Sequence, residues 1–316
     1  ANRLETPVNN VYRFTVFTPT YNRAHTLPRV YESLKRQTFR DFEWLIVDDG
    51  STDNTRELVK NWQKENLLPI RYFWQENAHK KAAFNRGVQE AKGELFLPLD
   101  SDDEALPAAL EILNRHWCGI PDLEREKFSA VTGLCVDKKG RIVGSRFPAD
   151  LLDSNSLEIR YRYQVTGEKW GFQRTDILRQ FPYLLDVDGH VPEGIVWSAI
   201  ARKYKTRFVN ESLRIYYIED DSLSKSAVVY GAAKNAEGHA LWAREVLCNE
   251  WCYFAYSPKW FLKMAANYSR FHRHLQKTQP GKHYPLRGLV PRLLVALMWP
   301  VGMLRYGLDL KKAPRG

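Results

Sequence analysis

Three carboxylates lie close together in the segment Asp100-Ser101-Asp102-Asp103. The segment follows the apolar run 95–99 and precedes Pro107, a residue type that often begins a helix. Mg²⁺ and Mn²⁺ prefer carboxylate oxygens and commonly share their coordination with substrate phosphates. The segment is therefore either a metal site for a diphosphate or a solvated acidic turn that caps the next helix.

Two further polar segments follow predicted strands. Residues 18–23 follow a strand at 14–17, and residues 48–53 follow a strand at 44–47. In open α/β sheets, ligands bind outside the carboxyl ends of the strands. Three polar loops at one edge of a parallel sheet would form a single site, which favours the metal interpretation of the acidic segment.

Short apolar strands and amphipathic helices alternate through the first half of the chain. Strands are predicted at 14–17, 44–47, 70–74 and 95–97, and helices at 27–34, 54–65, 82–91 and 106–117. Further strands are predicted at 130–136, in a hairpin at 141–144, and at 207–209 and 213–217. This order predicts an α/β fold with a mainly parallel sheet flanked by helices.

Four segments together resemble the family 2 glycosyltransferases of the GT-A fold. They are Thr-Pro-Thr-Tyr-Asn-Arg at 18–23, Val-Asp-Asp-Gly-Ser-Thr-Asp at 47–53, Lys-Lys-Ala-Ala-Phe-Asn-Arg-Gly at 80–87 and Leu-Asp-Ser-Asp-Asp at 99–103. The resemblance covers about residues 13–220. It implies the nucleotide-diphospho-sugar transferase fold, with a nucleotide-sugar half at about 13–117 and an acceptor half at about 118–220.

The resemblance also implies an enzyme that moves a sugar from a nucleotide-diphosphate sugar, in the first place a UDP-sugar, to a hydroxyl acceptor. The transfer is expected to invert the anomeric carbon and to need Mn²⁺ or Mg²⁺. An aromatic ring offers a stacking surface for the base, a carboxylate accepts from its N–H edge, and lysine binds pyrophosphate as a point charge. The implied donor-binding residues are Thr18, Tyr21, Asp48, Asp49, Lys80, Lys81, Asp100 and Ser101, and Asp102 is implied to hold the metal.

A general base is expected near residue 193. Pro192 is placed to begin a helix, and Glu193 stands four residues before Trp197, the spacing that the resemblance favours. Asp186 and Asp188 remain alternatives. A polar loop at 219–226, which includes Lys225, is expected to close over the pyrophosphate. Residues 167–172 are interpreted either as a grip on the acceptor or as an edge strand.

The net positive charge is confined to the last third of the chain. Residues 221–316 hold 15 Lys and Arg against 5 Asp and Glu, whereas residues 1–220 hold 32 of each. This segment is predicted to be a basic helical extension. Its apolar run 293–304 is shorter than the roughly 20 residues of a membrane span. Residues 285–308 are therefore either an anchor in the membrane interface or a core helix.

These features predict an anionic membrane surface as a partner and a saccharide or lipid-linked saccharide of cell-surface glycan assembly as the acceptor. The four cysteines form no disulfide framework, and the polar residues 1–10 predict no signal peptide. The chain is thus expected in the cytoplasm, peripheral at the inner face of the cell membrane. Nucleic-acid binding through the basic aromatic region is the alternative, and the absence of a recognised nucleic-acid-binding motif in the sequence argues against it.

Overall fold

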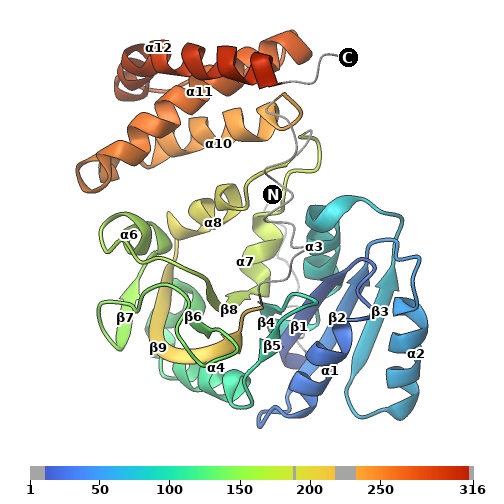
Figure 1. The fold of residues 1–316 in the computed structure, drawn as a ribbon. Coiled ribbons are helices and arrows are strands. Elements are labelled where there is room, and N and C mark those ends of the chain that lie inside the picture. The colour runs from blue at the N-terminus through green and yellow to red at the C-terminus, as the bar shows by residue number, and fades with distance from the viewer. Residues whose placement is uncertain (1–10, 188–189, 218–232, 313–316) are drawn as a thin grey trace, which may run out of the picture. The chain divides into compact units, whose positions relative to one another are not determined.

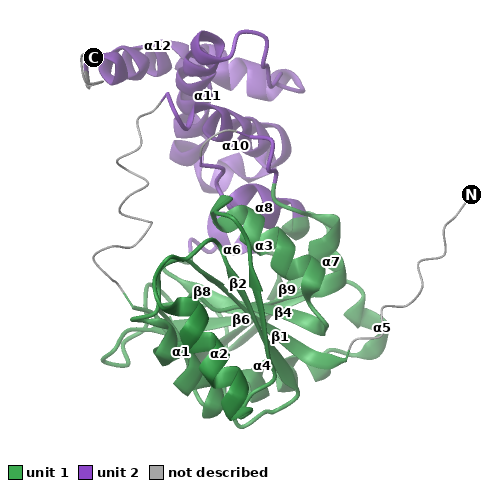
Figure 2. Cartoon of the chain, turned by 90° about the vertical axis from the view of Figure 1, so that its right-hand side faces the viewer, with its two compact units in different colours: residues 1–155, 165–183, 200–217 green, residues 156–164, 184–199, 218–316 purple. Residues whose placement is uncertain are grey.

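The computed structural model describes residues 11–187, 190–217 and 233–312. The chain divides into two compact units (Figure 2). The first unit comprises residues 1–155, 165–183 and 200–217, and the second comprises residues 156–164, 184–199 and 218–316. The boundary predicted at residue 220 differs from this division, because segments 156–164 and 184–199 also belong to the second unit.

The first unit is built on a sheet of nine strands within the described residues (Figure 1). The strands are β1 (Tyr12–Thr20), β2 (Phe42–Asp48), β3 (Ile70–Trp74), β4 (Gly93–Pro98), β5 (Glu104–Ala105), β6 (Phe128–Val136), β7 (Leu151–Ser154), β8 (Lys169–Arg174) and β9 (Lys205–Ile215). Their order is β3-β2-β1-β4-β8-β6-β9-β5, and β7 also pairs with β9. Strands β1 to β4 are parallel to one another, whereas β8 is antiparallel to both of its neighbours.

Helices follow most of the strands. In the first unit they are α1 (Leu27–Lys35), α2 (Thr55–Glu65), α3 (His79–Glu90), α4 (Ala109–Cys118), α5 (Asp122–Arg125) and α7 (Thr175–Gln180). The second unit contains α6 (Ser156–Tyr161), α10 (Ala236–Asn249), η1 (Trp251–Tyr256), α11 (Pro258–Thr278) and α12 (Leu289–Lys312), and α8 (Gly194–Ala201) begins there. The predicted α/β fold with a mainly parallel sheet is confirmed.

The alternation of side chains along β1 separates the two faces of the sheet. Phe14 and Val16 belong to a core that also takes the apolar stripes of α1, α2 and α4. Phe17 lies on the other face, where its ring contacts those of Phe84 in α3 and Phe96 in β4. Both faces of β1 and β2 are therefore covered by helices, which is why their sequences read as nearly continuous apolar runs.

Three details of the predicted sheet are corrected by the structure. The two late strands form one continuous strand, β9. The predicted hairpin strand at 141–144 is reduced to a single bridge between Val136 and Ile142. Strand β8 lies inside the sheet rather than at its edge, and Trp170 and Phe172 are buried in the core. Its aromatic residues are thus packing residues.

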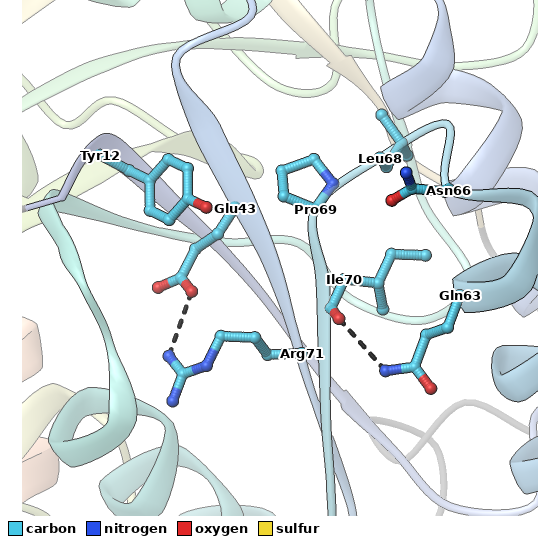
Figure 3. A pocket seen from close by; sticks show the side chains of 8 residues that line it. All are labelled: Tyr12, Glu43, Gln63, Asn66, Leu68, Pro69, Ile70 and Arg71. Atoms are coloured by element: carbon cyan, nitrogen blue, oxygen red, sulfur yellow. Dashed lines mark hydrogen bonds and ion pairs between the residues drawn. The ribbon is translucent and has the colours of Figure 1, made fainter.

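The amino-terminal ends of the strands carry a shallow polar pocket (Figure 3). At its base lies the fully buried Glu43 carboxylate, which accepts hydrogen bonds from the Thr15 hydroxyl at 2.6 Å and the Lys92 N–H at 2.7 Å. Arg71 Nη1 donates to its second oxygen at 3.1 Å. Both oxygens of this buried carboxylate have hydrogen-bond partners, which is typical of a residue that stabilises the sheet.

The second unit is helical. Val187 and Val191 pack against Leu241 of α10. The Tyr161 hydroxyl of α6 donates to buried Glu250 at 2.5 Å. These contacts explain why segments 156–164 and 184–199 belong to this unit.

Helix α12 packs against α11 along one face only. A Cβ at Gly302 would lie 2.6 Å from the Ala266 carbonyl, so the close approach of the two helices requires glycine there. Arg270 Nη2 lies 2.5 Å from Asp309 Oδ1, and His274 Nε2 lies 2.9 Å from Asp309 Oδ2. These contacts fix which face of α12 is covered.

Candidate active site

The loops that follow β1 and β2 are joined by hydrogen bonds. The Asp49 N–H donates to the Thr20 carbonyl at 2.8 Å, and the Asn22 N–H donates to Ser51 Oγ at 2.8 Å. Asn22 has a positive φ of 52° and its side-chain carbonyl accepts from the Thr52 N–H at 2.8 Å. The two polar loops therefore lie together at one edge of the sheet, as predicted.

The two aspartates at the end of β2 have different surroundings. Asp48 is fully buried, and its oxygens accept from the Ser51 N–H at 2.8 Å and the Tyr72 hydroxyl at 2.5 Å. Asp49 Oδ1 accepts from Gln75 Nε2 at 2.7 Å and from the Ala78 N–H at 3.0 Å. Asp48 thus holds its own loop in shape, whereas Asp49 also connects that loop to the segment leading into α3.

The two predicted pocket residues of the first loop also differ. Thr18 is fully buried, and its hydroxyl accepts the indole N–H of Trp44 at 3.0 Å, so its side chain belongs to the core. The Tyr21 side chain is 49% exposed. An exposed ring at the carboxyl edge of β1 is available for stacking against a flat ligand.

The acidic turn after β4 does not present its three carboxylates alike. Asp103 points into the protein, where its Oδ2 lies 3.1 Å from Arg214 Nη1 of β9 and its Oδ1 accepts from the Tyr217 N–H at 3.1 Å. Ser101 is also buried. Asp100 and Asp102 keep partly exposed side chains. The turn therefore offers two carboxylates to a ligand, not three.

Neighbouring charges act on these aspartates in opposite directions. The Lys80 ammonium, 3.0 Å from Asp100 Oδ1, lowers the pKa of Asp100. Burial, followed by the negative charge of Asp100, raises the pKa of Asp102. Burial raises the pKa of Asp103 to about 7, although Arg214 opposes this shift.

Two adjacent carboxylates fit a divalent cation. In the described part of the chain, no group of three or more His, Cys, Asp and Glu side chains is arranged to hold a metal alone. Mg²⁺ is commonly bound by one or two carboxylates together with substrate phosphates. A cation beside Asp102 would favour its ionised form, whose pKa is raised first by burial and then by the negative charge of Asp100. Asp100 and Asp102 are therefore suited to a metal that the donor diphosphate also binds.

The two candidate lysines lie in the first turn of α3. Lys80 is exposed and its ammonium contacts Asp100, while Lys81 is partly buried. A helix N-terminus favours anions through its unpaired N–H groups and dipole. Positive charge and the helix start therefore lie beside the acidic turn.

The candidate general bases lie in the second unit. Glu193 is exposed and immediately precedes α8, and its carbonyl accepts from the Val196 N–H at 3.0 Å. The helix begins at Gly194, two residues later than predicted. Asp186 is exposed, whereas Asp188 and the loop 219–226 with Lys225 lie outside the described residues.

Sequence reasoning missed several residues that support the site. Arg29 of α1 donates to the Asp102 carbonyl at 2.5 Å, and its guanidinium lies 3.7 Å from the centre of the Tyr217 ring. The Trp170 indole donates to the Pro98 carbonyl at 2.5 Å. Arg214 of β9 and Tyr217, two residues beyond the end of that strand, lie more than a hundred positions later in the sequence. No local pattern could have paired them with the acidic turn.

Comparison with known proteins agrees with this geometry. Residues 15–133 match the model of glycosyl transferase family 2. A Campylobacter jejuni GalNAc(5)-diNAcBac-PP-undecaprenol beta-1,3-glucosyltransferase is 28% identical over 229 residues, which cover 71% of this chain and 69% of that protein.

Two solved structures share the fold. A crystal structure of S. aureus TarS with UDP-GlcNAc has a TM-score of 0.58 at 18% identity, over 94% of this chain and 81% of that one. The mannosyltransferase PcManGT from Pyrobaculum calidifontis, with GDP-Man and Mn²⁺, has a TM-score of 0.53 at 17% identity, over 95% and 84%.

The match over residues 15–133 and the glycosyltransferase relative identify a nucleotide-sugar-dependent glycosyltransferase, and the sheet topology with the structural neighbours gives it the GT-A fold. Residues 15–133 carry the match to glycosyl transferase family 2, and a relative that aligns with 71% of the chain is a glycosyltransferase. The predicted resemblance is thereby confirmed.

Proposed function

We propose that this chain transfers a sugar from a nucleoside diphosphate, a UDP-sugar in the first place, to a hydroxyl of a saccharide or lipid-linked saccharide. The proposed transfer inverts the anomeric carbon and uses Mn²⁺ or Mg²⁺. The observation that carries the proposal is the acidic turn after β4, whose Asp100 and Asp102 lie beside the Lys80 ammonium and the start of α3. The UDP-GlcNAc and Mn²⁺ in the structural neighbours support it.

The proposed roles follow from the chemistry of each side chain. Tyr21 stacks on the base and Asp49 accepts from its N–H edge. Asp102, together with Asp100, holds the metal, which when bound neutralises charge on the leaving diphosphate. Lys80 and Lys81 add positive charge as that group departs. Glu193 takes the proton of the attacking hydroxyl.

The donor is identified by a hydrolysis screen. Nucleotide-sugars that differ in base and sugar are incubated with the full chain and Mn²⁺ or Mg²⁺, and the released nucleotide is measured. We expect release of UDP from one or a few UDP-sugars, and none after EDTA is added. Release that is equally fast with every nucleotide, or unchanged by EDTA, would contradict the proposed donor site.

Helix α12 supports a membrane-bound acceptor. Among the described residues, Leu289–Lys311 is long and apolar enough by length and composition to cross a membrane. The apolar run 293–304, which is too short for a membrane span, is only the uncharged middle part of this helix. The 24-residue helix is about 36 Å long. Length therefore does not exclude a span.

The arrangement of α12 favours a position in the membrane interface. Leu293, Leu297 and Leu304 are 59%, 68% and 67% exposed and recur along the helix face that does not pack on α11. Arg292 and Arg305 are exposed on either side of this stripe. An apolar stripe bordered by basic residues suits a helix lying in an anionic bilayer surface. We infer a cytoplasmic enzyme at the inner face of the cell membrane, and the relative named for an undecaprenol-linked substrate supports this.

Membrane binding is tested with a double substitution, Leu297→Glu with Leu304→Glu. Both side chains are exposed, so the variant should fold, but each charge opposes burial in the interface. We expect pelleting with phosphatidylserine-containing vesicles to fall at least about tenfold, since each buried leucine contributes roughly 1.5–3 kcal/mol. Leu123→Glu, at a 95% exposed leucine of the first unit, is the matched control. Equal pelleting of the wild type and the double variant would contradict the inferred anchor.

A further inference from the structure

The end of β9 is tied directly to the acidic turn. Arg214 Nη1 lies 3.1 Å from Asp103 Oδ2, and Asp103 Oδ1 accepts from the Tyr217 N–H at 3.1 Å. The residue after the turn, Glu104, pairs with Ile215 in the β5–β9 ladder. Arg214 is only 5% exposed and Asp103 only 1% exposed. A pair of ionisable groups this deep repays its loss of hydration only if the surrounding structure holds the two groups in close contact.

Cations from three different elements contact the turn. Lys80 of α3 contacts the Asp100 side chain, Arg29 of α1 contacts the Asp102 carbonyl, and Arg214 of β9 contacts the Asp103 side chain. The Lys80 side chain is 43% exposed, whereas that of Arg214 is 6% exposed. Exposed ion pairs contribute little, but breaking a buried pair leaves an uncompensated charge. Arg214 is therefore the contact that most strongly fixes the shape of the turn.

We propose that Arg214 is a positioning residue for the metal-binding face of the acidic turn. It holds Asp103 inside the protein, so that Asp102 is presented on the open side beside Asp100. This inference rests on the proposed function, in which Asp102 and Asp100 bind the metal. Without Arg214, the buried Asp103 carboxylate loses its counter-charge, and the turn relaxes to bring that group to water. The two metal-binding carboxylates then lose their fixed separation.

A merely structural role for Arg214 makes a different prediction, and the same strand supplies the comparison. Arg207, near the other end of β9, makes two hydrogen bonds with Asp153 of β7, at 2.8 and 2.7 Å. It is 7% exposed, almost as buried as Arg214. If the buried Arg–Asp pairs on β9 serve stability alone, removing Arg207 or Arg214 should change the unfolding temperature and Mn²⁺ binding to the same extent.

The test measures Mn²⁺ binding to the full chain in the presence of UDP, by the electron paramagnetic resonance signal of free Mn²⁺. We expect Arg214→Met to weaken Mn²⁺ binding at least about tenfold, because groups that orient metal ligands account for about 10–100-fold in affinity. Arg214→Lys should recover part of the loss, since it keeps the charge but not the planar donor geometry. Arg207→Met should lower the unfolding temperature yet bind Mn²⁺ within about twofold of wild type.

Either of two results overturns the inference: wild-type Mn²⁺ affinity in Arg214→Met, or an equal loss in Arg207→Met. If Arg214→Met does not fold, the near-isosteric Asp103→Asn decides, and it must show the same tenfold weakening. Failure of the proposed function has a separate signature. In that case Mn²⁺ binding depends on Arg214, but no nucleotide-sugar is hydrolysed or used for transfer.

Discussion

Asp102→Ala is expected to lose metal-dependent binding of the nucleotide-sugar and to slow sugar transfer by at least about 10²–10³-fold, the effect typical of removing one group that stabilises developing charge. The same substitution should not destabilise the protein. Burial and the nearby Asp100 raise the pKa of Asp102, so its carboxylate is held in an unfavourable environment when no cation is bound. We therefore expect an unfolding temperature equal to or above that of wild type, measured by calorimetry without metal.

Asp122→Ala is the matched control for this substitution. The Asp122 carboxylate is 87% exposed on α5, where it pairs with Arg125, and its removal should change neither donor binding nor transfer. Donor binding is measured by titration calorimetry with and without Mn²⁺. Full transfer by Asp102→Ala in the presence of EDTA would refute the assignment of Asp102 to a metal.

Glu193→Gln should transfer sugar at least about 10²-fold more slowly than wild type, while binding donor and metal normally. The hydroxyl of the acceptor must lose its proton as it attacks, and a positioned carboxylate accelerates such a step by roughly 10²–10⁴-fold. Glutamine keeps the shape of the side chain and removes its basicity. Glu193 is exposed at the start of α8, so the substitution should leave the fold intact.

The two alternative bases provide the comparison. Asp188→Asn should slow sugar transfer less than Glu193→Gln does, and Asp186→Asn should slow it less again. Rates of transfer and of donor hydrolysis are measured separately, because loss of the base should affect transfer to the acceptor more. If Asp188→Asn transferred no sugar while Glu193→Gln remained active, the general base would be Asp188 and not Glu193. Normal rates in all three variants would contradict the single-displacement mechanism.

The local part of this structure could be predicted from sequence. Apolar runs such as 44–47 identify central strands, because only a strand buried on both faces avoids polar residues over that length. The polar segments after β1, β2 and β4 could be assigned to one edge for a topological reason, since parallel strands end on the same side. The structure places Asp49 and Asp102 in the loops after β2 and β4, as this reasoning expects, and their binding roles stay predictions.

The parts that depend on distant pairing could not be predicted. Asp103 was grouped with the other two carboxylates of the turn, because nothing near it in sequence indicates its contact with Arg214. Trp170 and Phe172 read as residues of an edge strand or acceptor grip, since the insertion of β8 between β4 and β6 leaves no local signature. Thr18 read as a pocket residue, although the hydrogen bond with the Trp44 indole places it in the core. In each case the deciding contact comes from another strand of the sheet.

The insertion of β8 also has a consequence for how the chain is made. Strands β4 and β6 are synthesised first, yet in the finished sheet both are paired to β8, which ends at Arg174. Until that residue has left the ribosome, both strands keep an open edge, and open edges recruit other chains. The match to the family model ends at residue 133, within β6. Its limit is therefore not that of a folding unit, and a fragment cut there would carry an unpaired edge on β4.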